Sequence, residues 1–239
     1  FGLSIKNFKS FYKTIKKYKH IKLDALSVHI GSQILSDVPY KKMLNVMSNL
    51  IRELQLNLKF LDLGGGFGIS YNKKDKPIDL KKYSESVYKL AKKLKCKIIF
   101  EPGRSIIGDT GILLSKIQYI KKGVKKDFVI IDAGMNDFMR PALYDAVHKI
   151  IPTKKSSSKL KGVIEFVGPI CESTCKFGSY KNYQKMNEND FVAITNVGAY
   201  GSSLSSNYNS RPFIAELLVN KNKLKYIRKK QDLLRLINS

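Results

Sequence analysis

The sequence has few cysteines, three among 239 residues, which excludes a fold held together by a disulfide framework. Cys96, Cys171 and Cys175 are not accompanied by a second cysteine or histidine pair at the spacing of zinc ligands, so we expect no metal site. This cysteine usage is typical of the reducing cytoplasm, where we expect the protein to reside. Cys96 fits a small buried hydrophobic residue best.

Long apolar runs are also missing. None approaches the roughly 20 residues that a membrane-spanning helix requires, and we therefore expect no membrane partner. The hydrophobic fraction of 43 % is the usual one for a globular protein, and 239 residues can bury a sizeable core.

Arginine is rare as well. The formal net charge is +25, yet only six of the 44 basic residues are arginine. Proteins that read nucleic acids usually need arginine for bidentate contacts, and the lysines here are spread over the surface stretches instead of gathered on one face. We therefore interpret the charge as a solvated surface and expect no nucleic-acid partner. Three arginines lie within unusual motifs, where a planar guanidinium has a use: Arg104, Arg140 and Arg211.

Residues 1–108 repeat a strand followed by an amphipathic helix. The predicted strands are short apolar runs at 1–5, 25–30, 60–63 and 97–100, and the helical stripes lie at 8–15, 44–54 and 83–94. Such repeats predict a parallel sheet or a (β/α)₈ barrel, and four strands are too few to close a barrel. We expect this part to be a partial α/β barrel.

Residues 109–239 change pattern and favour a second domain. Apolar runs recur without long helices between them, which predicts a mostly antiparallel β domain. The predicted strands are 112–120, 128–132, 162–167, 191–195, 216–219 and 224–227, with a short closing helix at 232–237. The expected fold class is therefore α/β plus β.

Three predicted strands of the first part end in polar or glycine-rich motifs. Gly64, Gly65 and Gly66 could bring backbone amides to a phosphate, or simply form a tight turn. Glu101-Pro-Gly103-Arg104 combines a carboxylate for a protonated ring nitrogen with donors for a phosphate, although a turn with a surface ion pair is the alternative. His29 and Ser32 follow a third strand, and a lone histidine is more often a core or capping residue. Three such ends converging on one mouth favour a site.

The second part adds three further motifs: residues 132–144, 168–173 and 198–212. Cys171 follows a Gly-Pro turn and adjoins Glu172, so we expect it to be exposed in a loop. A thiol whose pKa is tuned acts as an acid or a nucleophile.

Together these motifs resemble the diaminopimelate decarboxylases, pyridoxal-phosphate (PLP) enzymes of fold type III that are related to ornithine decarboxylase and alanine racemase. The resemblance runs in family order over essentially the whole chain, and it rests on His29-Ile-Gly-Ser-Gln, Gly64-Gly-Gly, Glu101-Pro-Gly-Arg, Asn136-Asp-x-x-Arg-Pro-Ala-Leu-Tyr, Gly168-Pro-x-Cys-Glu-Ser and Gly198-Ala-Tyr-Gly. It implies the C-terminal part of an alanine-racemase-like (β/α)₈ barrel followed by the β domain.

The resemblance also implies cofactor-binding residues. His29 would stack on the ring of PLP, and Glu101 would pair with the ring nitrogen. Tyr200 would touch the cofactor too. The residues implied for the phosphate are Ser32, Gly64, Gly65, Gly66, Gly103 and Arg104.

For catalysis, the resemblance implies a homodimer with shared active sites. Cys171 would act across the dimer and protonate the substrate carbon after CO₂ has left, with His29 as the second catalytic residue. The reaction would convert meso-2,6-diaminopimelate to L-lysine and CO₂, the last step of lysine biosynthesis.

Substrate choice can be argued from the residues. The distal end of diaminopimelate carries a carboxylate, which suits Arg104, Arg140 and Tyr144, and an ammonium, which suits Glu172; Tyr200 is a further candidate. Ornithine or arginine lacks the distal carboxylate and would leave Arg140 unpaired. A related decarboxylase for such substrates and a non-catalytic PLP-binding homologue stay open as alternatives.

One feature of the family is not found in the sequence. The Schiff-base lysine of the family belongs upstream of Phe1, and no lysine here has its context. We therefore expect the chain to be an N-terminally truncated piece of a longer protein, inactive alone.

Overall fold

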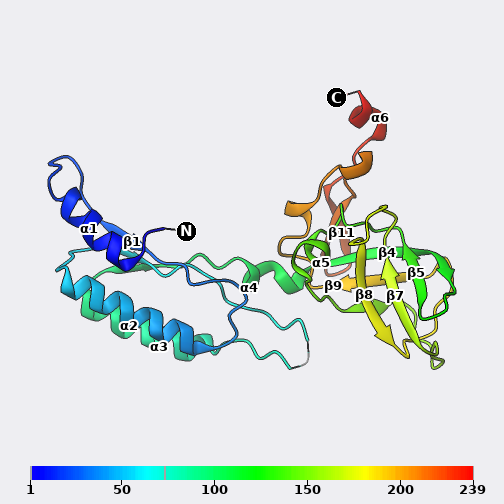
Figure 1. Ribbon diagram of the computed structural model, residues 1–239, viewed down its shortest axis with the longest axis horizontal. Helices are drawn as coiled ribbons and strands as arrows, with labels where there is room; N and C mark the ends of the chain where they lie inside the picture. The colour runs from blue at the N-terminus through cyan, green and yellow to red at the C-terminus, as the bar shows by residue number, and fades with distance from the viewer. Residues whose placement is uncertain (1, 73, 239) are drawn as a thin grey trace. The chain divides into compact units, whose positions relative to one another are not determined.

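The computed structural model describes residues 2–72 and 74–238, and its contacts separate into two compact units, Phe1–Ile106 and Ile107–Ser239 (Figure 1). The expected domain ranges, 1–108 and 109–239, stay a prediction.

The first unit is built on a small parallel sheet. Strands β1 (Ala25–Ser27), β2 (Phe60–Asp62) and β3 (Lys97–Ile99) lie in the order β1-β2-β3. The helices are α1 (Ile5–Ile15), α2 (Asp37–Glu53), α3 (Leu80–Leu94) and the short α4 (Arg104–Ile107). Helices α2 and α3 contact each other and run side by side in Figure 1. This is the predicted strand–helix repeat of a partial barrel.

The predicted strand at 1–5 is wrong where the structure describes it. Residues 2–4 form no strand, and Ile5 is the first residue of α1. The side chain of Ser4 accepts a hydrogen bond from the Asn7 amide at 3.2 Å and so caps the helix. This cap, with the helical spacing of the apolar residues that follow, outweighs a short apolar run; Phe1 lies outside the described residues.

The core of the first unit lies between the sheet and the helices. Helix α2 begins after Ser36, whose side chain accepts from the Val38 amide at 3.3 Å. Its apolar side packs against β2, where Leu61 is fully buried. The buried residues of α2 are Tyr40, Met43, Leu44, Met47, Leu50 and Ile51. The residues on either side of Leu61 in β2 point to the opposite face of the sheet, because side chains alternate along a strand.

The second unit is a mostly antiparallel β structure, as predicted. Its six-stranded sheet has the order β6-β9-β4-β5-β7-β8, in which only the β5–β7 pair is parallel, and β10 and β11 form a separate antiparallel pair. The strands are β4 (Ile112–Lys121), β5 (Asp127–Ile131), β6 (Ile150–Pro152), β7 (Val163–Val167), β8 (Lys176–Lys181), β9 (Phe191–Thr195), β10 (Glu216–Asn220) and β11 (Lys223–Arg228). The sequence pattern did not predict β6 and β8.

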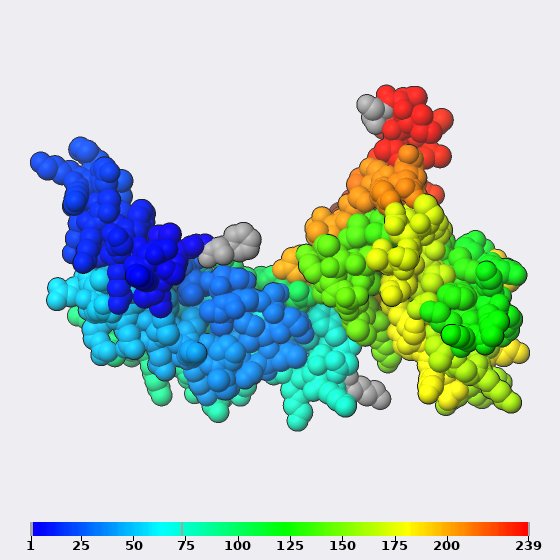
Figure 2. All heavy atoms as spheres, in the orientation of Figure 1, coloured from blue at the N-terminus to red at the C-terminus, as the bar shows by residue number. Residues whose placement is uncertain are grey.

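Short helical segments fill the connections of this unit. They are α5 (Arg140–Tyr144), α6 (Leu233–Ile237) and 3₁₀ turns at Gly108–Thr110, Ser202–Leu204 and Tyr208–Ser210. Helix α6 is the predicted closing helix, and Asp232 caps it by accepting from the Leu234 amide at 3.0 Å. Figure 2 shows the last part of the chain, which ends with α6 and is coloured orange and red, standing out from the body of the second unit.

The core of the second unit runs along the centre of the six-stranded sheet. Ile117, Val129, Ile131, Ile164 and Phe166 have no exposed surface. Strand β5 therefore provides a rigid base for the segment 132–140, which begins directly after it and carries several candidate site residues.

Candidate cofactor and substrate site

The glycine loop after β2 is packed against the ends of both neighbouring strands. A Cβ atom on Gly65 would lie 2.1 Å from the carbonyl oxygen of Glu101, and one on Gly66 would lie 2.2 Å from that of Gly31. Gly66 also has a φ of +87°, which side-chain-bearing residues rarely adopt. Glycine is therefore required by this close approach, which brings the three predicted strand ends together as expected.

Hydrogen bonds fix the arrangement of the three strand ends. The Gly64 amide donates to Asp62 Oδ1 at 2.8 Å, and the Glu101 amide donates to the Gly64 carbonyl at 2.8 Å. The Gly65 amide donates to His29 Nδ1 at 3.4 Å, which assigns the proton of a neutral imidazole to Nε2. Two amides of the glycine loop thus have partners within the protein, and their contact with a phosphate stays a prediction.

Arg104 joins two further loops of the first unit. Its Nη1 donates to Tyr71 Oη at 2.5 Å and its Nη2 donates to Ser32 Oγ at 3.1 Å. The guanidinium carbon lies 5.7 Å from the centre of the Tyr71 ring, within the range of a cation–π contact. The predicted pair of Ser32 and Arg104 is therefore in contact, while Tyr71 was missed because no motif marked it.

Tyr40 contacts the glycine loop, a role that was not predicted for it from the sequence. Its hydroxyl donates to the Gly65 carbonyl at 3.0 Å, and its side chain is fully buried. Burial raises the pKa of Tyr40 to about 12, so the hydroxyl stays a neutral donor over the physiological pH range. The signal in the sequence was its place on the apolar side of α2.

In the second unit, a buried polar network follows β5. Asn136 Nδ2 donates to Asp137 Oδ1 at 3.0 Å, and the Gly134 amide donates to Asp137 Oδ2 at 2.8 Å. Arg211 Nε donates to Asn136 Oδ1 at 3.1 Å and Nη2 donates to the Asp132 carbonyl at 2.8 Å. Burial raises the pKa of Asp137 above its usual range, although the Gly134 amide and the Arg211 charge act in the opposite direction.

Arg140 and Tyr200 lie together in this unit. Arg140 is 7 % exposed, and its guanidinium carbon lies 5.9 Å from the centre of the Tyr200 ring. Tyr200 has a φ of +57°, an unusual conformation for a bulky residue and one that clusters at functional sites. Tyr144, at the end of α5, is 64 % exposed.

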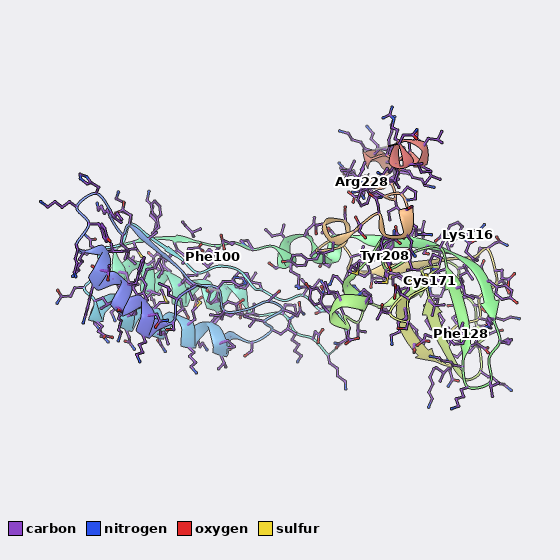
Figure 3. The ribbon with its side chains drawn as sticks, turned by 45° about the horizontal axis from the view of Figure 1, so that its top comes forward. Phe100, Lys116, Phe128, Cys171, Tyr208 and Arg228 are labelled. Carbon is purple, nitrogen blue, oxygen red and sulfur yellow. The ribbon has the colours of Figure 1, made fainter. Side chains whose placement is uncertain are left out.

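Cys171 is exposed in its loop, as expected, whereas Cys175 is buried and Cys96 is half-buried. Burial raises the pKa of the Cys96 thiol, in keeping with the predicted packing role. Asn209 Nδ2 donates to Cys171 Sγ at 3.7 Å, and Tyr208 Oη donates to Glu172 Oε1 at 2.5 Å. Figure 3 shows Cys171 and Tyr208 in the same part of the second unit. Tyr208 and Asn209 belong to the motif at 198–212, from which no role had been predicted for either residue.

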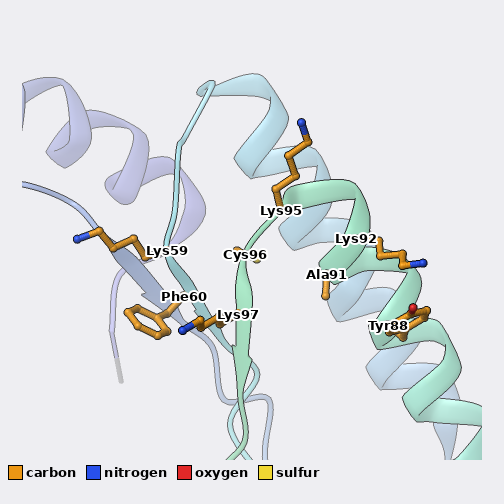
Figure 4. Close-up of a pocket in the computed structure, with 8 residues that line it drawn as sticks. All are labelled: Lys59, Phe60, Tyr88, Ala91, Lys92, Lys95, Cys96 and Lys97. Atoms are coloured by element: carbon orange, nitrogen blue, oxygen red, sulfur yellow. The ribbon is translucent and has the colours of Figure 1, made fainter.

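A cavity of about 500 Å³ lies elsewhere in the first unit, at the start of β2 and β3 and so at the other end of these strands from the glycine loop (Figure 4). Lys59, Lys92, Lys95 and Lys97 are among its lining residues. Their ammonium groups point in different directions in Figure 4, so they do not converge on a single anion.

Neither a metal centre nor a membrane span emerges from residues 2–72 and 74–238. Over that part of the chain, no three histidine, cysteine, aspartate or glutamate side chains group as a metal site would require. No helix there has both the length and the apolar character needed to cross a membrane.

Comparison with known proteins identifies the family. Residues 18–198 match the family model described as the pyridoxal-dependent decarboxylase, C-terminal sheet domain. Diaminopimelate decarboxylase from Aquifex aeolicus is 38 % identical over 235 residues, which cover 97 % of this chain and 56 % of the relative. The Helicobacter pylori enzyme is 39 % identical, with 98 % of this chain and 58 % of the relative covered.

Solved structures agree with these sequences. The crystal structure of the H. pylori diaminopimelate decarboxylase in complex with L-lysine matches with a TM-score of 0.88 and 37 % identity, covering 100 % of this chain and 59 % of that one. The chain thus spans a little over half the length of the relatives it matches. Pyridoxal phosphate is the cofactor of the matched decarboxylase family. The chain belongs to the pyridoxal-dependent decarboxylases, whose C-terminal sheet domain it contains.

Proposed function

We propose that the protein of which this chain is a part decarboxylates meso-2,6-diaminopimelate to L-lysine and CO₂. The observation that carries the proposal is the buried guanidinium of Arg140 beside Tyr200, a cation whose charge suits an anionic substrate group. The names of the relatives, at 38 % and 39 % identity, support the same substrate.

The residues of the first unit fit pyridoxal phosphate. The backbones of the glycine loop and of the 29–31 and 101 segments approach so closely that a Cβ atom on Gly65 or Gly66 would collide with them. This packing brings the strand ends together, and the contact of Arg104 with Ser32 at the same ends supports a phosphate site, for which Ser32, Gly103 and Arg104 are the further proposed ligands. Bound there, the cofactor would withdraw electrons from the substrate carbon that loses CO₂.

Two side chains are proposed to act on the cofactor ring. Glu101 lies at the end of β3, where its carboxylate would pair with a protonated ring nitrogen. His29 would lie against the ring. The Gly65 amide already donates to its Nδ1, which supports one fixed orientation of the imidazole.

The distal end of the substrate would be bound by charge complementarity. Arg140 is proposed for the carboxylate, helped by Tyr144, Tyr200 and Arg104, and Glu172 is proposed for the ammonium. Cys171 would supply the proton to the substrate carbon after CO₂ has left. Its exposure in the loop suits a thiol that acts on a bound substrate.

The remaining parts of the proposal concern assembly and location. We propose a homodimer in which Cys171 acts in the site of the other subunit, since the resemblance to the family implies shared sites. We further propose a cytoplasmic enzyme that performs the last step of lysine biosynthesis. Free thiols at Cys96, Cys171 and Cys175 are compatible with that compartment.

The test uses the complete reading frame with its upstream segment. CO₂ and lysine release are measured with meso-diaminopimelate, and L-ornithine is the control substrate. Release from diaminopimelate alone supports the proposal. Release from ornithine would retain the cofactor chemistry but overturn the substrate, and silence with both would favour the non-catalytic PLP-binding homologue.

A further inference from the structure

Residues 207–211 form a braced turn in the second unit. Asn209 and Ser210 have φ values of +55° and +54°, a conformation that costs about 1 kcal/mol for a residue with a side chain. Asn207 Nδ2 holds the turn by donating to the Arg211 carbonyl at 2.8 Å and to Gln231 Oε1 at 2.7 Å. The strained conformation is thus fixed by its surroundings.

The turn is also tied to the end of β5. The Ser206 amide donates to the Asn136 carbonyl at 2.9 Å, just before the turn, and Arg211 donates to Asn136 and Asp132 just after it. Both ends of the turn are therefore anchored to the same segment, and the position of the Tyr208 ring between them is defined.

The braced turn presents its side chains to the Cys171 loop. Tyr208 donates to Glu172 Oε1 at 2.5 Å and Asn209 donates to Cys171 Sγ at 3.7 Å. A hydroxyl that donates to a carboxylate forms one of the stronger hydrogen bonds in proteins. Because Cys171 Sγ accepts from Asn209, its own hydrogen is left to point elsewhere.

Among the described residues, Glu172 has no basic partner. The sequence has 44 basic residues, yet within residues 2–72 and 74–238 no lysine, arginine or histidine forms an ion pair with Glu172. Tyr208 binds one oxygen of the carboxylate and leaves its charge in place. The second oxygen can accept a cation that the described residues do not supply.

We infer that Tyr208 is a positioning residue for substrate specificity: it orients the Glu172 carboxylate toward the distal ammonium of the substrate. The inference rests on the proposed function. Tyr208 touches Glu172 and not the reacting atoms, so its effect is on recognition of the ammonium. The Glu172 carboxylate raises the pKa of Tyr208, which keeps the hydroxyl protonated as a donor.

The experiment compares two inhibitors of the complete enzyme. L-lysine retains the ammonium and carboxylate of the distal centre at its Cα, because the carbon that loses CO₂ becomes its Cε, and 6-aminohexanoate has the same length and carboxylate without the α-ammonium. Tyr208→Phe should weaken inhibition by L-lysine about fivefold and leave inhibition by 6-aminohexanoate unchanged, because only the α-ammonium depends on the orientation of Glu172. Tyr226→Phe is the matched control, since Tyr226 is an exposed tyrosine on β11.

The outcomes separate this inference from the proposed function. If the wild-type enzyme is active and Tyr208→Phe leaves inhibition by L-lysine unchanged, the inference alone is overturned. An equal weakening of inhibition by both compounds also overturns it, because that result would mean a general structural role for Tyr208. A wild-type enzyme that neither decarboxylates diaminopimelate nor binds L-lysine overturns the proposed function, and the inference falls with it.

A spectroscopic measurement reads the contact without activity. The ultraviolet titration of the complete wild-type enzyme minus that of its Tyr208→Phe variant isolates the ionisation of Tyr208. Repeating the pair of titrations in a Glu172→Gln background should lower the pKa of Tyr208, because the carboxylate that raises it is gone. An identical difference curve would overturn the contact on which the inference depends.

Discussion

The guanidinium of Arg211 lies 3.6 Å from the carboxylate of Asp137, whose side chain is only 3 % exposed. The two residues are far apart in the sequence, and their pairing ties the turn at 207–211 to the end of β5. It also places a positive charge beside a carboxylate whose pKa burial raises.

We therefore expect Arg211→Gln to destabilise the chain at neutral pH by about 1–3 kcal/mol, because it leaves a buried carboxylate without its cation. A group whose pKa is raised in the folded state stabilises fully below its unfolded pKa and loses that contribution as the pH rises through the folded pKa. Arg211 offsets this loss, so the cost of removing it should shrink as the pH falls toward the pKa of Asp137. Urea unfolding of both proteins at about pH 7 and about pH 4.5 measures it.

The control for this experiment is Arg235→Gln, an exposed arginine on α6. It should leave the free energy of unfolding within about 0.5 kcal/mol at both pH values. An Arg211→Gln penalty that is equal at the two pH values would show that Asp137 is not the group Arg211 compensates.

Gly65→Ala should destabilise the first unit strongly. Its Cβ would lie 2.1 Å from the Glu101 carbonyl oxygen, and backbone cannot move aside as a flexible side chain can. We expect a loss of about 2–3 kcal/mol in the free energy of unfolding, typical of overpacking. Thermal unfolding followed by circular dichroism measures it.

Gly162→Ala is the matched comparison for Gly65→Ala. Gly162 has a φ of +83°, but a Cβ atom added there would have no neighbour within 4 Å. Its cost comes from backbone conformation alone and should be about 1 kcal/mol. Equal losses for the two variants would contradict the role of the close approach at Gly65.

Arg104→Lys should weaken cofactor retention in the complete protein. The guanidinium donates to Tyr71 and Ser32 at once, and a lysine ammonium cannot reproduce this planar fork. We expect the dissociation constant of pyridoxal phosphate to rise about tenfold, since a charged hydrogen bond is worth about 1.5–3 kcal/mol. Absorbance of the bound cofactor during dialysis follows it, with the exposed Arg52→Lys on α2 as control. Unchanged retention would remove Arg104 from the proposed phosphate ligands.

Alkylation should distinguish the three thiols. Cys171 is exposed, Cys175 is buried, and the pKa of the half-buried Cys96 is raised. At neutral pH, iodoacetamide should therefore modify one thiol of the chain first, as intact mass will show. The early adduct should disappear in Cys171→Ser. If it persists there and is lost in Cys96→Ser, the assignment of Cys171 as the accessible thiol is wrong.

Much of the local structure followed from spacing along the chain. The apolar stripes predicted α2 and α3, and the glycines after 60–63 predicted a phosphate-binding loop or a tight turn, where the structure has Gly64 and Gly66 at positive φ. Strand β8 was not predicted, since Gly178 and Ser179 separate its two aromatic residues, Phe177 and Tyr180, and leave no continuous apolar run. The expected strand at 1–5 failed because a serine cap makes the segment after it a helix.

The class of fold could be predicted without coordinates, because periodicity is a local property, and motif spacing named the candidate site residues, whose roles stay a prediction. Which of these residues meet was settled by tertiary packing. Tyr71 reaches Arg104, Tyr40 reaches Gly65 and Tyr208 reaches Glu172 only because the chain folds back over more than 20 residues in each case. Such contacts depend on the packing of whole elements, and no pattern within one segment encodes them.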